Sequence, residues 1–134
     1  MTHAYVQSGE AMSYELEWHT SDKVLLLTLS GNYSVDEAKE ANRLILDELD
    51  QADNLVFILI DAMNMTRPYN FGEIRAVQSF MDHRNLSHIY VGTGDRLVKL
   101  AMMVIFNLSR AYLHICDDTD KANFMLERQL NIRR

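Results

Sequence analysis

The fold is decided by the stretch Leu55-Val56-Phe57-Ile58-Leu59-Ile60-Asp61. Its first six residues are all apolar, which is typical of a strand in the middle of a sheet that is covered on both faces. The run stops at the carboxylate of Asp61. The carboxyl ends of such strands are where α/β sheets usually carry functional groups. We therefore predict a central strand that ends at Asp61.

Two strands and a helix are predicted before this run. Residues 14–19 alternate between apolar and polar side chains, residues 20–23 form a polar turn, and residues 24–29 are mostly apolar. Two such runs joined by a short turn predict a hairpin. Ser34 then begins a helix, because Glu37 three positions later completes a capping box and apolar residues follow at helical spacing to about Asp50.

The rest of the chain alternates between helices and strands. We expect a loop over 62–69, a helix from the cap Asn70 to about Asn85 with Glu73 at the box position, and a strand over 88–91. A third helix follows, with Asp95 as its cap, and runs to about Arg110. The last strand covers 112–116, and a final helix completes the order. The inner face of that helix should consist of Ala122, Met125, Leu126 and Leu130.

These elements predict an α/β fold with a mixed five-stranded sheet and four helices in the order ββαβαβαβα. Strands that alternate with helices give a mostly parallel sheet, and the hairpin places the first strand antiparallel at an edge. A chain of 134 residues suits one domain. We assign that domain to residues 14–130, with a flexible segment at 1–13 and a tail at 131–134.

Composition limits the classes of partner. The net charge of −6 repels nucleic acid and anionic membrane surfaces. Cys116 is the only cysteine, so an internal disulfide is impossible and a reducing compartment is expected. We see neither a signal peptide at the start nor an apolar run long enough to span a bilayer. These features predict a soluble cytoplasmic protein.

The order of elements and the residues after the central strand resemble the STAS domains, the family of anti-sigma-factor antagonists (SpoIIAA-like). Val56 to Ile60 followed by Asp61 is similar to the strand end of that family. Residues 69–72 fall where the family has an Asp-Ser-Ser-Gly-like motif at a helix start. Residues 118–122 are similar to the acidic segment that opens the family's last helix.

The resemblance implies a regulatory module that is switched when a partner kinase phosphorylates the serine of that motif. Asn70 stands at the serine position and cannot be phosphorylated, and Tyr69 replaces the acidic residue. The resemblance therefore implies a STAS-like regulatory or scaffold module without the serine switch, unless Thr66 or Tyr69 takes its place.

Two apolar clusters are candidates for an interaction surface. On a helical wheel of the third helix, Arg96, Lys99, Asn107 and Arg110 define the polar face, with Met103 in its middle and Phe106 at its edge. A second cluster surrounds the loop after Asp61. Ordinary core packing is the alternative interpretation of both. The predicted surface consists of Asp61, Met63, Met65, Tyr69, Asn70, Phe71, Gly72, Lys99, Met103 and Phe106.

The remaining motifs do not predict catalysis. Residues 92–95, Gly-Thr-Gly-Asp, fit a tight turn and helix cap better than an anion site. The five histidines lack metal-ligand spacing. Cys116 lies in a predicted strand, where a thiol usually packs. We predict no cofactor and no metal.

The functional hypothesis is a non-enzymatic module that acts through protein–protein contacts and forms a homodimer. A carrier of a small apolar or lipid ligand in a SEC14-like pocket is the alternative. An enzyme that uses Asp61 with a neighbouring histidine is a third reading, which needs a pocket that brings the two together.

Overall fold

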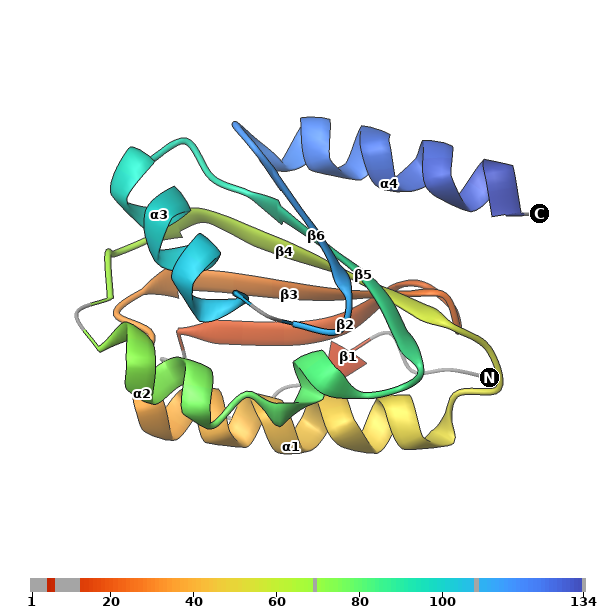
Figure 1. Cartoon of the computed structure of the whole chain (residues 1–134), viewed down its shortest axis with the longest axis horizontal. Helices are drawn as coiled ribbons and strands as arrows, with labels where there is room; N and C mark the ends of the chain where they lie inside the picture. Colours follow the sequence, from red (N-terminus) through yellow and green to blue (C-terminus); the bar gives the residue numbers. More distant parts are fainter. Residues whose placement is uncertain (1–4, 7–12, 69, 108, 134) are drawn as a thin grey trace.

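The structure is a computed structural model that describes residues 5–6, 13–68, 70–107 and 109–133. Strands alternate with helices along most of the chain (Figure 1). The strands are β1 (Tyr5–Val6), β2 (Tyr14–Thr20), β3 (Val24–Gly31), β4 (Val56–Met65), β5 (Leu86–Gly92) and β6 (Tyr112–Cys116). The helices are α1 (Val35–Gln51), α2 (Phe71–Ala76), the 3₁₀ helix η1 (Ser79–Asp82), α3 (Arg96–Ile105) and α4 (Thr119–Arg133).

All the strands form one sheet, whose spatial order follows the sequence from β1 to β6. β2 pairs antiparallel with β1 and β3, whereas β3, β4, β5 and β6 run parallel. The predicted α/β class, mixed sheet and four α-helices are therefore confirmed, and β4 lies in the sheet between β3 and β5. β2 is not an edge strand as predicted, because β1 pairs with it. β1 falls within the segment 1–13, of which residues 1–4 and 7–12 lie outside the described residues.

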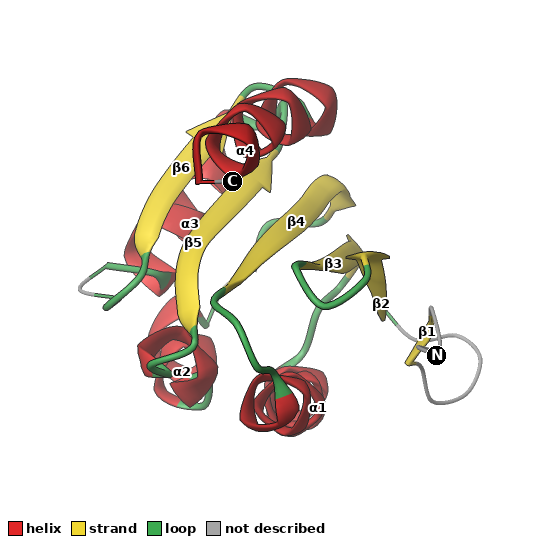
Figure 2. Ribbon diagram, turned by 90° about the vertical axis from the view of Figure 1, so that its right-hand side faces the viewer, coloured by secondary structure: helices red, strands yellow, loops and turns green. Residues whose placement is uncertain are grey.

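The helices form two layers. The connections between parallel strands are right-handed. The three connections from β3 to β6 each lead to the next strand in the same direction across the sheet, so their helices lie on the same face. That face carries α1, α2 and α3 over the larger core cluster. α4 follows the last strand and packs on the other face, over Phe57, Leu59 and Tyr90 (Figure 2). Among the described residues, no helix combines the length and the apolar character that crossing a bilayer requires.

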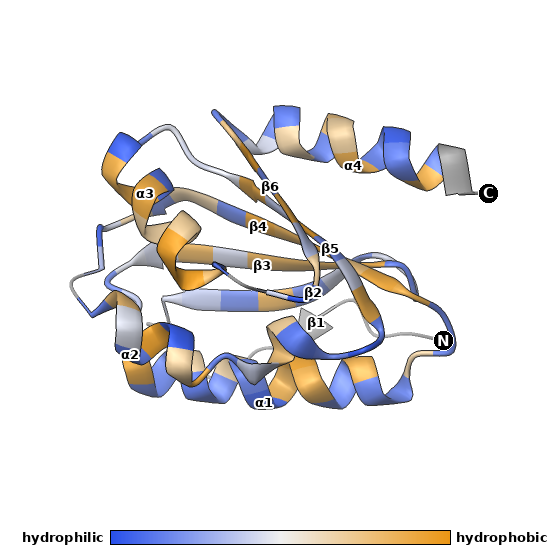
Figure 3. Ribbon diagram, viewed as in Figure 1, coloured by the Kyte–Doolittle hydropathy of each residue, from blue (hydrophilic) through white to orange (hydrophobic). Residues whose placement is uncertain are grey.

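The first helix has the predicted start. The Ser34 hydroxyl accepts a hydrogen bond from the Glu37 N–H, and the Glu37 side chain accepts one from the Ser34 N–H, so the capping box is present. The apolar face of α1 that points at the sheet consists of Ala38, Ala41, Ile45 and Leu49. The polar residues alternate with these along the ribbon (Figure 3).

The second helix is shorter than predicted. A continuous helix to Asn85 is wrong, since α2 ends at Ala76 and η1 follows. Asn42 of α1 explains the break: its side-chain oxygen accepts the Phe80 N–H at 2.8 Å, and its amide donates to the Ser79 hydroxyl at 3.2 Å. The predicted side-chain cap at Asn70 is also absent; only its backbone carbonyl accepts a bond, from Ile74.

Two other bounds differ from the prediction. β4 continues to Met65 through the predicted loop, because Ser30 and Gly31 of β3 still pair with it there. The third helix ends at Ile105 rather than near Arg110. The following segment is held against η1, where the Ser109 hydroxyl donates to the Met81 carbonyl and the Arg110 N–H donates to Asp82.

Candidate interaction surface

The start of α3 is fixed by its N-cap. One carboxylate oxygen of Asp95 accepts hydrogen bonds from the backbone N–H groups of Leu97 and Val98, at 2.8 and 3.1 Å. The bonds from Val98 and Leu97 hold the pKa of the Asp95 carboxyl below its usual value. This cap sets the rotation of the helix, so that Val98 is buried and Leu97 is exposed.

The outer surface of α3 is mostly apolar. Its large apolar side chains are between 45% and 54% exposed, and they are Leu97, Leu100, Met103 and Val104. We call these four residues the α3 face. Their positions recur at helical spacing, and the opposite side of the helix is buried in the core. The predicted exposure of Met103 is confirmed, within a wider apolar surface than the sequence indicated (Figure 3).

Phe106 does not belong to this surface. The sequence placed it at the edge of the exposed side, but it is only 4% exposed and packs edge-on against Phe80, with ring centroids 6.2 Å apart. It lies four residues after Met102 and therefore falls on the buried side of the helix. Lys99 is partly exposed and donates to Asp117 at 2.7 Å, which ties α3 to the end of β6.

The residues after Asp61 are divided between surface and core. Met63 is exposed at the end of β4 and approaches Gly94 just before α3, whereas Met65 is buried. At the start of α2, Gly72 is exposed, Asn70 and Phe71 are partly buried, and Phe71 packs against the core. Tyr69 lies outside the described residues. Only Met63 of this cluster therefore extends the α3 face.

Asp61 itself is engaged by its neighbours. One of its carboxylate oxygens accepts hydrogen bonds from the Met63 N–H at 3.1 Å and from the Thr119 hydroxyl at 2.9 Å. No group of three or more histidine, cysteine or acidic side chains among the described residues is arranged to hold a metal ion. The arrangement around Asp61 fastens the loop and the last helix.

β6, the strand that follows α3, forms one edge of the described sheet and pairs only with β5 there (Figure 2). Tyr112 is its most exposed side chain, at 70%. A groove of about 570 Å³ lies beside the end of this strand and the start of α4. It is lined by Ile115, Cys116, Asp117, Asp118, Asp120, Lys121, Phe124 and Met125.

This groove was not predicted from the sequence. Met125 was placed on the inner face of the last helix, but it is 41% exposed, because α4 turns Ala122 and Leu126 toward the sheet. Phe124 is also exposed, and the sequence pattern did not single it out as part of a surface. The alternation in 112–116 indicated a strand, and only the sheet order shows that this strand is the outermost one.

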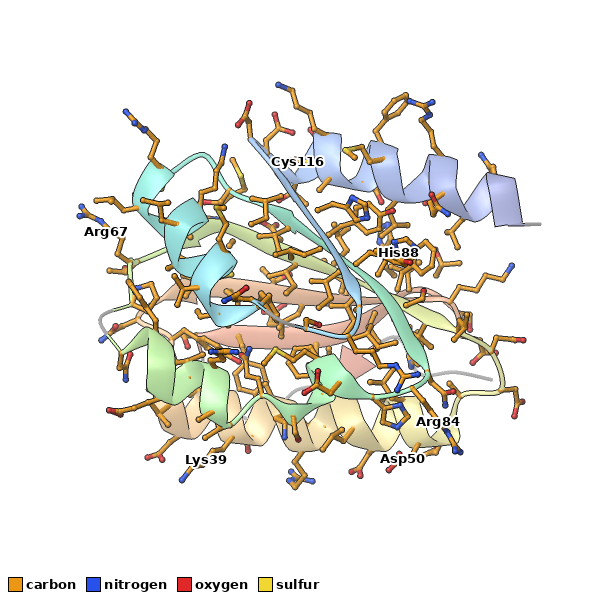
Figure 4. All side chains as sticks on the ribbon, in the orientation of Figure 1. Lys39, Asp50, Arg67, Arg84, His88 and Cys116 are labelled. Atoms are coloured by element: carbon orange, nitrogen blue, oxygen red, sulfur yellow. The ribbon has the colours of Figure 1, made fainter. Side chains whose placement is uncertain are left out.

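Cys116 lies at the end of β6 beside α4 (Figure 4). Burial raises the pKa of its thiol, and the carboxylates of Asp117 and Asp118 raise it further. The Cys116 Sγ lies 3.4 Å from the Met125 Sδ. A thiol whose pKa is raised is a weaker nucleophile near neutral pH.

Two histidines meet on the face that α4 covers. His88 Nδ1 and His114 Nε2 are 3.2 Å apart, so one imidazole donates and the other accepts. The His114 ring also stacks on Tyr90, with centroids 4.4 Å apart. Burial lowers the pKa of His114. The two rings stack on each other and form an aromatic layer between the sheet and α4.

No family model, no curated protein and no solved structure matches the chain.

Proposed function

We propose that the chain is a non-enzymatic, STAS-like regulatory or scaffold module that acts through protein–protein contacts and associates with itself. The α3 face is the observation that carries this proposal. Four neighbouring apolar side chains, each about half exposed, form a surface that water solvates poorly. Contiguous apolar patches on soluble domains usually mark contact sites.

The chemistry of this surface also favours binding. Met103 and Met63 are unbranched and adaptable, which suits a contact that must fit a second surface. Lys99, one of the two cations of α3, is paired with Asp117. The four residues of the α3 face are uncharged, as in the centre of a protein–protein interface, and the exposed Arg96 lies at the start of the same helix.

The polar groups support a role without catalysis. The Asp61 carboxylate accepts two hydrogen bonds from the protein's own groups, and the Cys116 thiol has a raised pKa. Neither group is prepared as a general base or nucleophile.

The test replaces the centre of the α3 face with charge. In the double variant Leu100→Glu/Met103→Glu, both carboxylates would have to be desolvated in any interface, so we expect self-association to weaken by at least roughly 100-fold. The matched control is Lys39→Glu on the outer side of α1, which changes the net charge by the same amount (Figure 4). Sedimentation velocity of the wild-type chain and both variants gives the result. Equal association of all three would overturn the proposal.

The groove beside β6 supports a second candidate, a carrier of a small apolar or lipid ligand. Its volume of about 570 Å³ and its apolar residues Phe124 and Met125 would accommodate an acyl chain. An enclosed space between the sheet, α2 and α3 measures only about 10 Å³, which leaves no room there for a lipid. Native mass spectrometry of freshly purified protein separates the two functions. A bound lipid mass supports the carrier, and an empty dimer supports the interaction module.

A further inference from the structure

The exposed apolar side chains are concentrated at one edge of the sheet. In the described residues, the large apolar side chains that are at least 41% exposed number nine. Seven of them belong to three consecutive elements, α3, β6 and α4: Leu97, Leu100, Met103, Val104, Tyr112, Phe124 and Met125. The other two are Leu55 and Met63, at the two ends of β4. The edge formed by β6 therefore combines an apolar surface with an outermost strand.

The backbone of β6 has a defined outward side. The Cys116 carbonyl accepts the Thr93 N–H at 3.1 Å, so it points toward β5. The backbone groups of successive strand residues point to alternate sides. The N–H and C=O groups of Leu113 and Ile115 consequently point away from the sheet, as a template for another strand.

We infer that this other strand is β6 of a second copy of the chain, paired antiparallel with its centre at His114. This inference names the partner and the contact for the self-association proposed above, and it rests on that proposal. Only this register pairs all five residues of β6. It places Leu113 opposite Ile115 of the second copy, with both outward backbone pairs hydrogen-bonded, and it sets the two His114 residues directly opposite each other.

The same register fits a protruding side chain to the groove. Tyr112 falls opposite Cys116 of the second copy, on the face that carries α4. Among the described residues Tyr112 is the most exposed of the large apolar side chains, and Cys116 lies in the wall of the groove. Each Tyr112 ring therefore enters the groove of the other copy, against Phe124 and Met125. A two-fold contact repeats this insertion reciprocally.

Charge favours the antiparallel direction. Arg110 precedes β6, and Asp117 and Asp118 follow it. Antiparallel pairing sets Arg110 opposite Asp118 of the second copy, whereas parallel pairing would align like charges. Lys99 and Lys121 pair with Asp117 within the chain. One oxygen of Asp118 accepts the Lys121 N–H at 2.7 Å, and its carboxylate is the one placed for Arg110 of the partner copy. Opposite charges across an interface fix its register.

The two-fold axis of such a pair is perpendicular to the sheet, so each face of one sheet continues into the same face of the other. The α3 faces of both copies then lie on the same side of the junction, next to each other. Strand pairing thereby brings the two α3 faces to the same side of the dimer.

Disulfide trapping tests the register. In the Tyr112→Cys variant, the new thiol should lie opposite the native Cys116 of the second copy. The two residues form a non-hydrogen-bonded antiparallel pair, in which the Cα atoms are about 4.5 Å apart. A disulfide can span this distance. Diamide takes up the two electrons and two protons that the thiols release, and most of the protein should become a covalent dimer on a non-reducing gel. The control Tyr112→Cys/Cys116→Ser should stay uncross-linked.

A second variant keeps the tyrosine. His114→Cys in a Cys116→Ser background should form one disulfide at the two-fold axis. Arg110→Glu should weaken association roughly tenfold at low salt, whereas Arg43→Glu on α1, with the same change in charge, should leave it unchanged. A chain that dimerises but cross-links at neither position would overturn this inference and leave the proposed function standing. A wild-type chain that sediments as a monomer would overturn the proposed self-association itself.

Discussion

The Thr119 hydroxyl donates a hydrogen bond to the Asp61 carboxylate, 2.9 Å away, and so joins the first residue of α4 to β4. The two residues are 58 positions apart in the sequence. α4 is the only α-helix on its face of the described sheet. This bond therefore helps to hold in place the helix that forms one wall of the groove.

Removal of the Thr119 hydroxyl should loosen that attachment. Thr119→Val keeps the shape of the side chain but leaves the partly buried carboxylate with one donor fewer. Hydrogen bonds to charged groups contribute about 1.5–3 kcal/mol, so we expect the free energy of unfolding to fall by about 1–2 kcal/mol. Urea denaturation measures it. Thr119→Ser, which retains the hydroxyl, is the control, and equal stability of the two variants would contradict this role.

The close approach of β5 to the start of α4 requires a glycine at position 92. A Cβ atom at this position would lie 2.4 Å from both the N and the Cα of Thr119, and backbone atoms cannot move aside as a flexible side chain can. We expect Gly92→Ala to destabilise the fold by at least about 2 kcal/mol, a large effect for one methyl group. Thermal denaturation should show the loss as a lowered Tm.

The matched control for that variant is Gly72→Ala in α2, where a Cβ atom would meet no atom of the described residues within 4 Å. Because alanine is the better helix former, this change should be neutral or stabilise the fold by up to about 1 kcal/mol. If both glycine variants lost stability equally, the close approach at Gly92 would not be the reason.

The features that could be predicted from the sequence depend on local pattern. The all-apolar run before Asp61 indicated a strand covered on both faces, and β4 lies in the middle of the parallel part of the sheet. The capping box at Ser34 and Glu37 is local, and the α1 start was predicted correctly. Strand and helix order follow from periodicity in the same way.

The features that could not be predicted depend on residues distant in the sequence. Asn42 ends the second helix by accepting the Phe80 N–H, 38 positions away. The sequence placed Met103 on the outer side of α3 but left core packing as the alternative, because apolar spacing alone does not say which side meets the sheet. The exposed edge at β6 follows from the order of strands, which no local pattern contains.

Glu37 should make stability depend on pH in the acidic range. Burial by itself would raise the pKa of its carboxyl, but hydrogen bonds from the Ser13 side chain and backbone, and then from Ser34, outweigh burial and lower the pKa below 4.5. A carboxyl with a lowered pKa in the folded state stabilises the fold above the unfolded value. That contribution is lost as the pH falls through the folded value.

The wild-type chain should therefore lose stability between about pH 5 and pH 3 more steeply than Glu37→Gln. Glutamine keeps the capping box, because its amide oxygen can still accept the Ser34 N–H. Its amide nitrogen replaces the oxygen that accepts the Ser13 N–H, so the variant removes the charge together with that bond. Urea midpoints across this range provide the measurement. Parallel pH profiles for the two proteins would show that the bonds from Ser13 and Ser34 do not favour the charged carboxylate.

Gln78 should be a position where a polar side chain weakens the core. It is 3% exposed, and its Nε2 has no hydrogen-bond partner among the described residues. It borders the enclosed space of about 10 Å³ beside Met65 and Phe106.

A buried donor without a partner costs about 1–3 kcal/mol, and methionine has nearly the same shape without the donor. Gln78→Met should therefore raise the free energy of unfolding by about 1 kcal/mol in urea denaturation. Gln78→Glu, which buries a charge in the same place, should lower it, and a loss of stability in the methionine variant would mean that the amide makes a stabilising contact.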